Sequence, residues 1–244
     1  MIITKQSYLL VLMVCVLRNV FLALVVAFPR GPVQATTADG DASVISVEDF
    51  TNPRHKWKEM NDPVMGGKST GTFAIENGVG AFLGEVVDVP FLQAPGFIQA
   101  RTVDRAAHYP DLRACQGLQL TLTSDHPEYQ GYRFSFGHAH PPDGKFFAFG
   151  YKTSFQVAAA DSTTTQQTIV LPFHGFTDLW DDATGEPIQT CQDAPQYCPT
   201  PQALQRLGEM AVWAEGVAGS ASLHLHSIAA YGCAAEATKA STSF

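Results

Sequence analysis

The sequence has few charged residues, and basic residues are in the minority. Asp, Glu, Lys and Arg make up 16% of the 244 residues, with 15 Lys and Arg against 23 Asp and Glu. The formal net charge of -8 argues against the basic surface that a protein needs to follow the phosphates of a nucleic acid. We therefore predict no nucleic-acid partner. The 45% of hydrophobic residues in turn excludes an intrinsically disordered chain.

Signals for cofactors and metal ions are also missing. No two cysteines form the Cys-x-x-Cys pair that commonly holds zinc. Gly67-Lys68-Ser69 resembles the end of a phosphate-binding loop, but Asp62 stands where that motif requires its first glycine. The motif also needs a helix to follow, whereas the next residues are typical of a strand. We predict no cofactor, no bound metal and no enzyme activity.

The first 35 residues lack acidic side chains and are expected to be a targeting segment. They carry Lys5, Arg18 and Arg30, with Arg18 between two apolar runs, 8–17 and 20–28. An arginine in the middle of a membrane helix costs roughly 2.5 to 3.5 kcal/mol of insertion free energy, so a permanent span is disfavoured. The small residues at 33–35 predict a secretory signal peptide, 1–35, with an uncleaved signal anchor as the alternative.

Two other destinations remain open. Val26-Ala27-Phe28-Pro29 resembles the presequences of algae with complex plastids, although transit peptides are poor in acidic residues and Asp39 and Asp41 follow. A mitochondrial presequence should be an Arg-rich amphipathic helix, and this apolar stretch is not one. We expect the secretory pathway, extracellular or lumenal, then a complex plastid, and less readily a mitochondrion.

Four cysteines remain once Cys15 leaves with the signal peptide. An even number of cysteines in a chain that enters an oxidising compartment is typical of disulfide-bonded proteins. Three pairings are possible. We favour a bond between Cys191 and Cys198 across a local loop and a bond between Cys115 and Cys233 between strands, with zinc as the rival interpretation.

The mature chain has the hydrophobic pattern of an all-β protein. Apolar residues alternate with polar ones and are interrupted by Gly, Pro and Asn about every ten residues. Asn77-Gly78 predicts a tight hairpin turn between strands at 72–75 and 79–87. Further strands are expected at 44–50, 96–103, 117–123, 132–137, 146–157, 168–173, 210–214 and 222–231.

These strands predict a single β-sandwich domain over residues 44–233. One short helix is expected at 202–207, since Thr200 can cap it and Pro201 fits the first helical position. Residues 36–43 are small and polar and are predicted to be a loose linker. Residues 234–244 have the same composition and are predicted to be a disordered tail.

The densest run of conformationally special residues lies between Trp57 and Gly71. Short polar side chains can cap its turns, a proline fixes one φ angle, and a Gly-Gly pair permits backbone conformations closed to other residues. We expect a rigid loop that leads into a strand near Thr72, with Gly67 at a positive φ. The residues that define this motif loop are Trp57, Asn61, Asp62, Pro63, Met65, Gly66, Gly67, Ser69 and Gly71.

This motif loop resembles the hallmark of the NADH:ubiquinone oxidoreductase complex I intermediate-associated protein 30 family. Further matches follow in the same order along residues 46–231: Phe82 to Gly84, Gly96-Phe97 with Arg101, Gly117-Leu118, the Tyr132 strand, Val170 to Phe173 with Phe176, and the strand 223–229. The resemblance implies a galactose-binding-like jelly roll, similar to carbohydrate-binding modules, without established catalysis. Residues 178–200 are expected to be an insertion relative to the family.

Other residues could form a ligand face. Trp180 beside Asp181, together with Trp213, could stack on a sugar or supply oxygen ligands to calcium, or Asp181 could simply lie in a hydrated turn. Arg101 could anchor an acidic ligand or pair with a carboxylate of the protein itself. Two pairs of histidines, His138 with His140 and His224 with His226, should each share one strand face, as metal ligands or as ordinary strand residues.

Two functions are compatible with these observations. The resemblance implies a non-catalytic binding module that binds a protein client or complex subunit during assembly of a membrane complex. The leader, the cysteines and the jelly roll would equally fit a secreted or lumenal carbohydrate-binding β-sandwich, in which Trp180 or Trp213 should be exposed beside a groove.

Overall fold

The structure is a computed structural model that describes residues 43–62, 66–104, 109–137, 150–159, 165–181 and 184–234. All of these belong to the second of the two units into which the chain divides, Asp39–Phe244. Several sequence predictions lie outside the described residues, namely the signal peptide 1–35, the linker up to residue 42, the tail from residue 235, Pro63, Met65, His138 and His140. Within the described ranges, no helix is long and apolar enough to cross a membrane.

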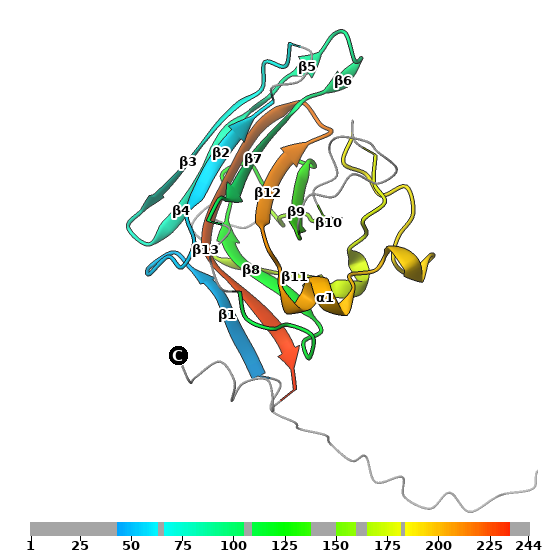
Figure 1. Ribbon diagram of the computed structural model, residues 1–244. Helices are drawn as coiled ribbons and strands as arrows, with labels where there is room; N and C mark the ends of the chain where they lie inside the picture. The colour runs from blue at the N-terminus through cyan, green and yellow to red at the C-terminus, as the bar shows by residue number, and fades with distance from the viewer. Residues whose placement is uncertain are drawn as a thin grey trace, which may run out of the picture. The chain divides into compact units, whose positions relative to one another are not determined.

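Two large antiparallel sheets and one two-stranded hairpin make up the described part of this unit (Figure 1). The first contains β1 (Ser43–Asp49), β3 (Thr70–Glu76), β4 (Val79–Val86), β8 (Gly117–Thr123), β11 (Gln167–Pro172) and β13 (Gly219–Cys233). Its order is β11-β8-β13-β4-β3, and β1 joins by pairing with β13. The second contains β2 (Trp57–Asn61), β7 (Phe97–Thr102), β9 (Tyr132–Phe136), β10 (Tyr151–Ser154) and β12 (Met210–Glu215), in the order β10-β9-β12-β7-β2.

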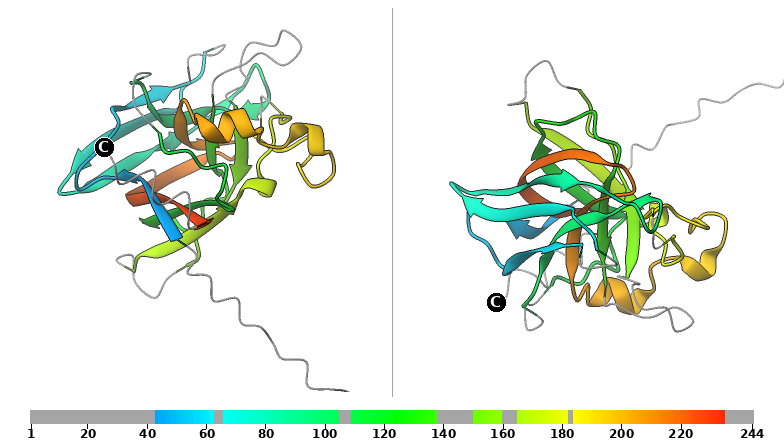
Figure 2. Two further views of the ribbon diagram at one scale, coloured as in Figure 1. Left: turned by 60° about the horizontal axis from the view of Figure 1, so that its bottom comes forward. Right: turned by 90° about the horizontal axis from the view of Figure 1, so that it is seen from above.

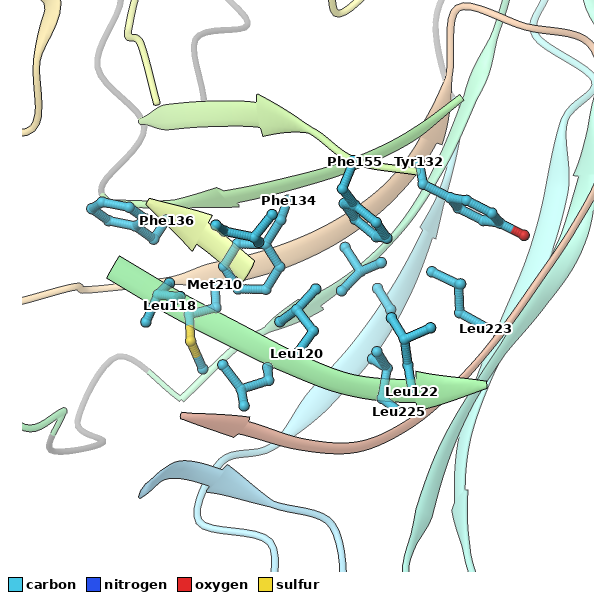
Figure 3. Close-up of a cluster of buried hydrophobic side chains, with 14 of the residues drawn as sticks. Leu118, Leu120, Leu122, Tyr132, Phe134, Phe136, Phe155, Met210, Leu223 and Leu225 are labelled. Carbon is cyan, nitrogen blue, oxygen red and sulfur yellow. The ribbon is translucent and has the colours of Figure 1, made fainter. Parts of the chain in front are cut away.

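The hydrophobic core lies between the two sheets. Along β8, Leu118, Leu120 and Leu122 are fully buried, as the alternation of side chains along a strand requires. Figure 3 shows these leucines packed against residues from β9, β12 and β13, among them Phe134 and Leu223. The all-β sandwich that the alternating pattern predicted, and that the family resemblance implied, is therefore confirmed.

The hairpin turn and the helix cap that the sequence predicted are both confirmed. Asn77 and Gly78 have φ values of 51° and 79° and close the hairpin between β3 and β4, because a primed turn needs two positive φ angles. The helix α1 (Pro201–Gln205) begins after Thr200, whose side chain accepts a hydrogen bond from the backbone of Ala203. It is shorter than the predicted 202–207 segment and is accompanied by two 3-10 helices, Phe173–Gly175 and Pro195–Tyr197.

The start of the motif loop differs from the prediction. Residues 57–61 were expected to belong to a rigid loop, but they form β2 at the edge of the second sheet, paired with β7. A five-residue strand that carries Lys58, Glu59 and Asn61 has little apolar alternation, so periodicity alone does not reveal it. The two-residue strands β5 (Asp88–Val89) and β6 (Ala94–Pro95), which form a small hairpin, were not predicted either.

Two disulfides join the pairs that the sequence favoured. Cys115, in the turn before β8, is bonded to Cys233 at the end of β13, and Cys191 is bonded to Cys198 within the segment that follows β11. Figure 2 shows this segment, coloured yellow, beside β10. Disulfides are typical of proteins that fold in an oxidising compartment.

We expect the two disulfides to differ in their contribution to stability. The Cys115–Cys233 bond spans 118 residues and the Cys191–Cys198 bond spans 7. Chain-entropy reasoning assigns about 5 kcal/mol to a loop of the first length and about 2 kcal/mol to the second. Urea unfolding of Cys115→Ser/Cys233→Ser should therefore give a larger loss of unfolding free energy than Cys191→Ser/Cys198→Ser. Equal losses would contradict this.

Candidate functional site

The carboxylate of Glu48, near the end of β1, is fully buried and accepts four hydrogen bonds. Its Oε1 accepts from the backbone N–H of Asp49 at 3.0 Å and of Arg54 at 2.8 Å. Its Oε2 accepts from His55 Nδ1 at 2.8 Å and from Trp57 Nε1 at 2.9 Å. A buried carboxylate is stable only when its lone pairs are satisfied in this way, so Glu48 fixes the chain from β1 to the first residue of the motif loop.

Burial and hydrogen bonding act on Glu48 in opposite directions. Burial raises the pKa of the carboxyl, but the hydrogen bonds from His55, Trp57 and the Arg54 amide together lower it, and the net pKa lies below the ordinary value of 4.5. Because His55 donates through Nδ1, its neutral form keeps the lone pair on Nε2. That atom is buried without a hydrogen-bond partner among the described residues, and the imidazole ring stacks on Tyr109 at 4.3 Å.

Sequence analysis did not identify Glu48 or His55 as important. Strict alternation in β1 places Ile45 and Val47 inward and would place Glu48 toward solvent. The pairing of β1 with β13 has a register shift between Ser46 and Glu48, and this irregularity turns the carboxylate inward. A bulge of this kind leaves no signal in a single sequence.

The predicted motif residues are brought together around the loop between β2 and β3. Trp57 packs against Phe73 of β3, with ring centroids 5.4 Å apart. Asn61 Oδ1 accepts a hydrogen bond of 2.7 Å from the N–H of Gly71. Ser69 is buried, and its Oγ accepts a 3.0 Å hydrogen bond from the N–H of Val87 just before the β5–β6 hairpin. The motif thus joins β2, β3 and this hairpin.

The two glycines of the Gly66-Gly67 pair have different roles. Gly66 has a φ of +83°, which most side chains avoid, and a Cβ there would meet nothing within 4 Å. Gly67 has no positive φ, so the expectation of one at this position is wrong. It is a glycine because a Cβ would come within 2.5 Å of Asp62 Oδ2 and 2.8 Å of the Asp62 carbonyl oxygen. Asp62 also lies against Gly96, after β6.

The motif loop is not a nucleophile site. Gly67-Lys68-Ser69-Thr70-Gly71 has the Gly-x-Ser-x-Gly spacing of hydrolases, but a nucleophile elbow leads from a strand into a helix and exposes its serine. Here Ser69 is 2% exposed, bonds to the backbone of Val87 and is followed by a strand. The hydroxyl therefore supports the loop.

Trp180 and Trp213 do not form the exposed aromatic face that a sugar would need. Trp180 is 8% exposed and Trp213 is 2% exposed. The ammonium group of Lys152 lies 3.7 Å from the Trp180 ring centroid and 4.1 Å from that of Trp213, and it forms a 2.7 Å ion pair with Glu215. These contacts attach the segment after β11 to the outer face of the second sheet, which explains why β9 is buried on both faces.

Asp181 and Arg101 have partners within the chain. Asp181 Oδ1 accepts hydrogen bonds from the backbone N–H and the hydroxyl of Thr184, as expected for an acidic turn. Arg101, on β7, forms a 3.1 Å ion pair with Glu209, and their side chains are 33% and 24% exposed. Both arrangements match the structural alternatives that were weighed for these residues rather than a ligand contact.

Ser222 and His224 on β13 form a cluster with Asp125, which follows β8, but the cluster lacks the geometry of a catalytic triad. Asp125 Oδ2 accepts from both Ser222 Oγ at 2.8 Å and His224 Nε2 at 2.9 Å. In a triad the serine would bond to the histidine nitrogen that faces away from the carboxylate. Among the described residues, no group of three or more His, Cys, Asp or Glu side chains is placed to hold a metal ion, His224 and His226 included.

We expect Gly67→Ala to destabilise the fold through a steric clash with Asp62. Forcing a methyl group into a filled site costs about 1 to 3 kcal/mol, and each kcal/mol lowers the melting temperature of a domain of this size by about 2 to 4 °C. Gly175→Ala is the matched control, because a Cβ there meets nothing closer than 3.7 Å. Thermal melts of the two variants that did not differ would refute this explanation.

Glu48 should make stability depend on pH on the acid side. Its pKa is lower in the folded state than the ordinary 4.5, so its contribution is complete above that value and is lost as the pH falls through the folded pKa. We expect Glu48→Gln to lose at least about 2 kcal/mol at pH 7 and to show a flatter decline between pH 5 and 3 in thermal melts, since buried hydrogen bonds to a charged group are strong.

Glu128→Gln is the control for this prediction, because the carboxylate of Glu128 is 73% exposed. Its melting curves should follow those of the wild type at neutral pH. If Glu48→Gln also behaved like the wild type at every pH, the four hydrogen bonds to Glu48 would not be important for stability.

Comparison with known proteins gives both a family and distant structural likenesses. A family-11 carbohydrate-binding module from Clostridium thermocellum, solved with a β-1,3-1,4-mixed-linked tetrasaccharide, matches with a TM-score of 0.47 and 12% identity over 78% of this chain and 96% of that one. A solution structure of CtCBM11 gives a TM-score of 0.43 and 12% identity, over 80% and 98% of the two chains. No curated protein matches.

The chain also matches a family model. The model of the family described as "Complex I intermediate-associated protein 30 (CIA30)" covers residues 48–191, from the buried Glu48 carboxylate through the motif loop to Cys191. This range is more than half of the chain and includes every described residue of the motif loop. The chain therefore belongs to the complex I intermediate-associated protein 30 family.

Proposed function

We propose that this protein is a non-catalytic binding module that holds a protein client during the assembly of a membrane complex. Membership of the complex I intermediate-associated protein 30 family supports this class of function. The internal pairing of the charged side chains supports it as well. The carboxylates of Glu48, Glu209 and Glu215 and the cations of Arg101 and Lys152 all have partners within the chain, which is not the arrangement of a catalytic cleft.

The observation that carries the proposal is an exposed apolar tip held by the family motif. Phe91 is 76% exposed and Leu92 is 41% exposed, at the end of the β5–β6 hairpin. A large aromatic side chain in this position is unfavourable in water unless a partner covers it. Phenylalanine and leucine side chains suit a protein client better than a sugar, because they offer no hydrogen bonds.

The motif loop keeps this tip in place. Val87 donates to Ser69, and its carbonyl accepts a 3.0 Å hydrogen bond from Gly96, so both ends of the hairpin are tied to each other and to the motif loop. Asp62 packs against Gly96 from the same side. A preorganised tip binds without the entropic cost of ordering a loop, which explains why the motif could matter for binding without touching the client.

The carbohydrate-binding alternative predicted that Trp180 or Trp213 is exposed as a surface for stacking on a sugar. Both side chains are instead buried against Lys152. The two disulfides suit an oxidising compartment, such as the secretory pathway, a plastid or another lumen. Such a location is compatible with both functions. We keep the secretory or lumenal location as part of the proposal.

Replacement of Phe91 tests the proposal. We expect the tagged full-length chain, expressed in its source cell, to co-purify with subunits of a membrane complex, and Phe91→Ser to reduce their yield about tenfold, the effect of about 1.4 kcal/mol at a binding hot spot. Val44→Ser is the control, because Val44 is also exposed, at 54%, but lies on β1.

Two outcomes would overturn the proposed function. The wild-type chain could retain no complex subunit at all, or it could bind sugars on a glycan array while retaining no protein. Equal yields of complex subunits with Phe91→Ser and Val44→Ser would show that the client does not bind at the hairpin tip.

A further inference from the structure

The strand β11 lies at one edge of the first sheet. It pairs with β8 on one side, from Gln167 opposite Leu122 to Pro172 opposite Gly117, and it is the terminal strand in the sheet order. Figure 2 shows it, coloured yellow-green, as the outermost strand of its sheet. An edge strand presents a row of N–H and C=O groups that no neighbouring strand uses.

The register shows which groups of β11 face outward. The N–H of Phe173 donates to the carbonyl of Gln116 at 3.0 Å. Phe173 and every second residue before it therefore form the backbone hydrogen bonds with β8. The N–H and C=O groups of Thr168 and Val170 therefore point away from the sheet. Pro172 fits the same alternation, because its missing N–H falls on the outer side.

Among the described residues, Ala158 lies against the start of this edge, where its N–H and C=O bond to the side chain of Gln167, and the edge beyond Gln167 is exposed at Thr168 and Val170. No described residue forms a backbone hydrogen bond with Thr168 or Val170 on the outer side. The side chain of Val170 is 52% exposed, and residues 165–172 include no charged side chain. Natural proteins usually protect such an edge with a lysine, a bulge or a covering segment.

The other edges of the two sheets are protected in these ways. The edge strand β10 is covered by Thr177, which exchanges hydrogen bonds of 2.8 and 3.0 Å with Lys152. On β3, the N–H of Gly71 donates to Asn61, and Phe73 is covered by Trp57. The edge strand β2 carries Lys58 and Glu59, and β1 has two register shifts.

We propose that β11 is the docking edge for an extended segment of the protein client, which pairs with it as an additional β-strand. The unused N–H and C=O groups of Thr168 and Val170 would supply the backbone hydrogen bonds of that pairing. This inference rests on the proposed function, since it states how the client is held.

The chemistry of the edge defines the segment that it accepts. A segment that pairs with β11 must be extended and must lack proline at the positions that face Thr168 and Val170. An apolar or β-branched side chain should lie beside Val170, because such cross-strand pairs stabilise antiparallel and parallel pairing alike. A charged residue on the client at this point would gain no partner, since residues 165–172 offer none.

Replacement of Val170 by proline tests the docking edge without disturbing the pairing of β11 with β8. Val170→Pro removes one outward N–H and no ladder bond to β8, and the extended conformation of Ile169 is the one preferred before proline. Val170→Thr is the matched control, because it keeps the N–H and the β-branched shape. Val170→Lys is a second variant, which leaves the backbone intact and places a protecting charge on the edge.

The experiment uses the tagged full-length chain in its source cell, and the probe is the set of complex subunits that co-purify with the wild type. We expect about tenfold less of these subunits with Val170→Pro and with Val170→Lys, and an unchanged yield with Val170→Thr, while the melting temperatures stay within a few degrees. Hydrogen exchange of the purified complex should show the amides of Thr168 and Val170 protected relative to the free chain.

Each outcome decides between the two proposals. If the wild type retains subunits and Val170→Lys retains them equally, the docking edge is wrong and the client-binding function stands. If the wild type retains none, both are overturned. If the two amides are protected in the purified chain alone and sedimentation shows a dimer, then the edge pairs with a second copy and not with a client.

Discussion

The buried carboxylate of Glu48 is the interaction on which the architecture of this protein depends. A fully buried charge is unfavourable by several kcal/mol unless it is compensated, and here two side chains and two backbone amides compensate it. One donor is Asp49, the last residue of β1, and the other three lie within the eight residues that follow, so the requirement to satisfy one carboxylate determines the course of the chain as it crosses to the second sheet. Trp57, held in this way, then packs on Phe73 and closes one side of the sandwich.

The family motif continues this support from the core to the surface. Asn61 and Ser69 form hydrogen bonds with neighbouring backbone, and Asp62 packs against the backbone of Gly67 and Gly96. The aromatic and charged residues that the sequence suggests as a ligand face also have partners within the chain. Lys152 between two tryptophan rings is a structural clamp for the segment that follows β11. The proposed function therefore relies on exposed apolar side chains and an open strand edge, which are common in contacts between polypeptide chains.

Much of the fold could be predicted because its signals are local. Alternation in 117–123, the turn at Asn77-Gly78 and the cap at Thr200 each depend on residues that are neighbours in the sequence. The candidate site could not be predicted to the same extent. The inward turn of Glu48 depends on a register shift against a strand some 180 residues later, and the burial of Trp180 and Trp213 depends on Lys152 from another strand. Gly67 illustrates the difference, because the sequence marked it as a conformationally special residue whereas the cause, close contact with Asp62, required the structure.

The position of β13 in the sheet order bears on how the protein is made. This 15-residue strand lies between β8 and β4 and also pairs with β1, yet it is the last of the strands in the described residues. Ser43 is opposite Cys233, at a separation of 190 residues. The first sheet therefore cannot form before β13 has left the ribosome, and the strands that precede it must wait with open edges until then. A chain that stopped before Gly219 would lack the strand that joins β8 to β4, and the first sheet would be divided.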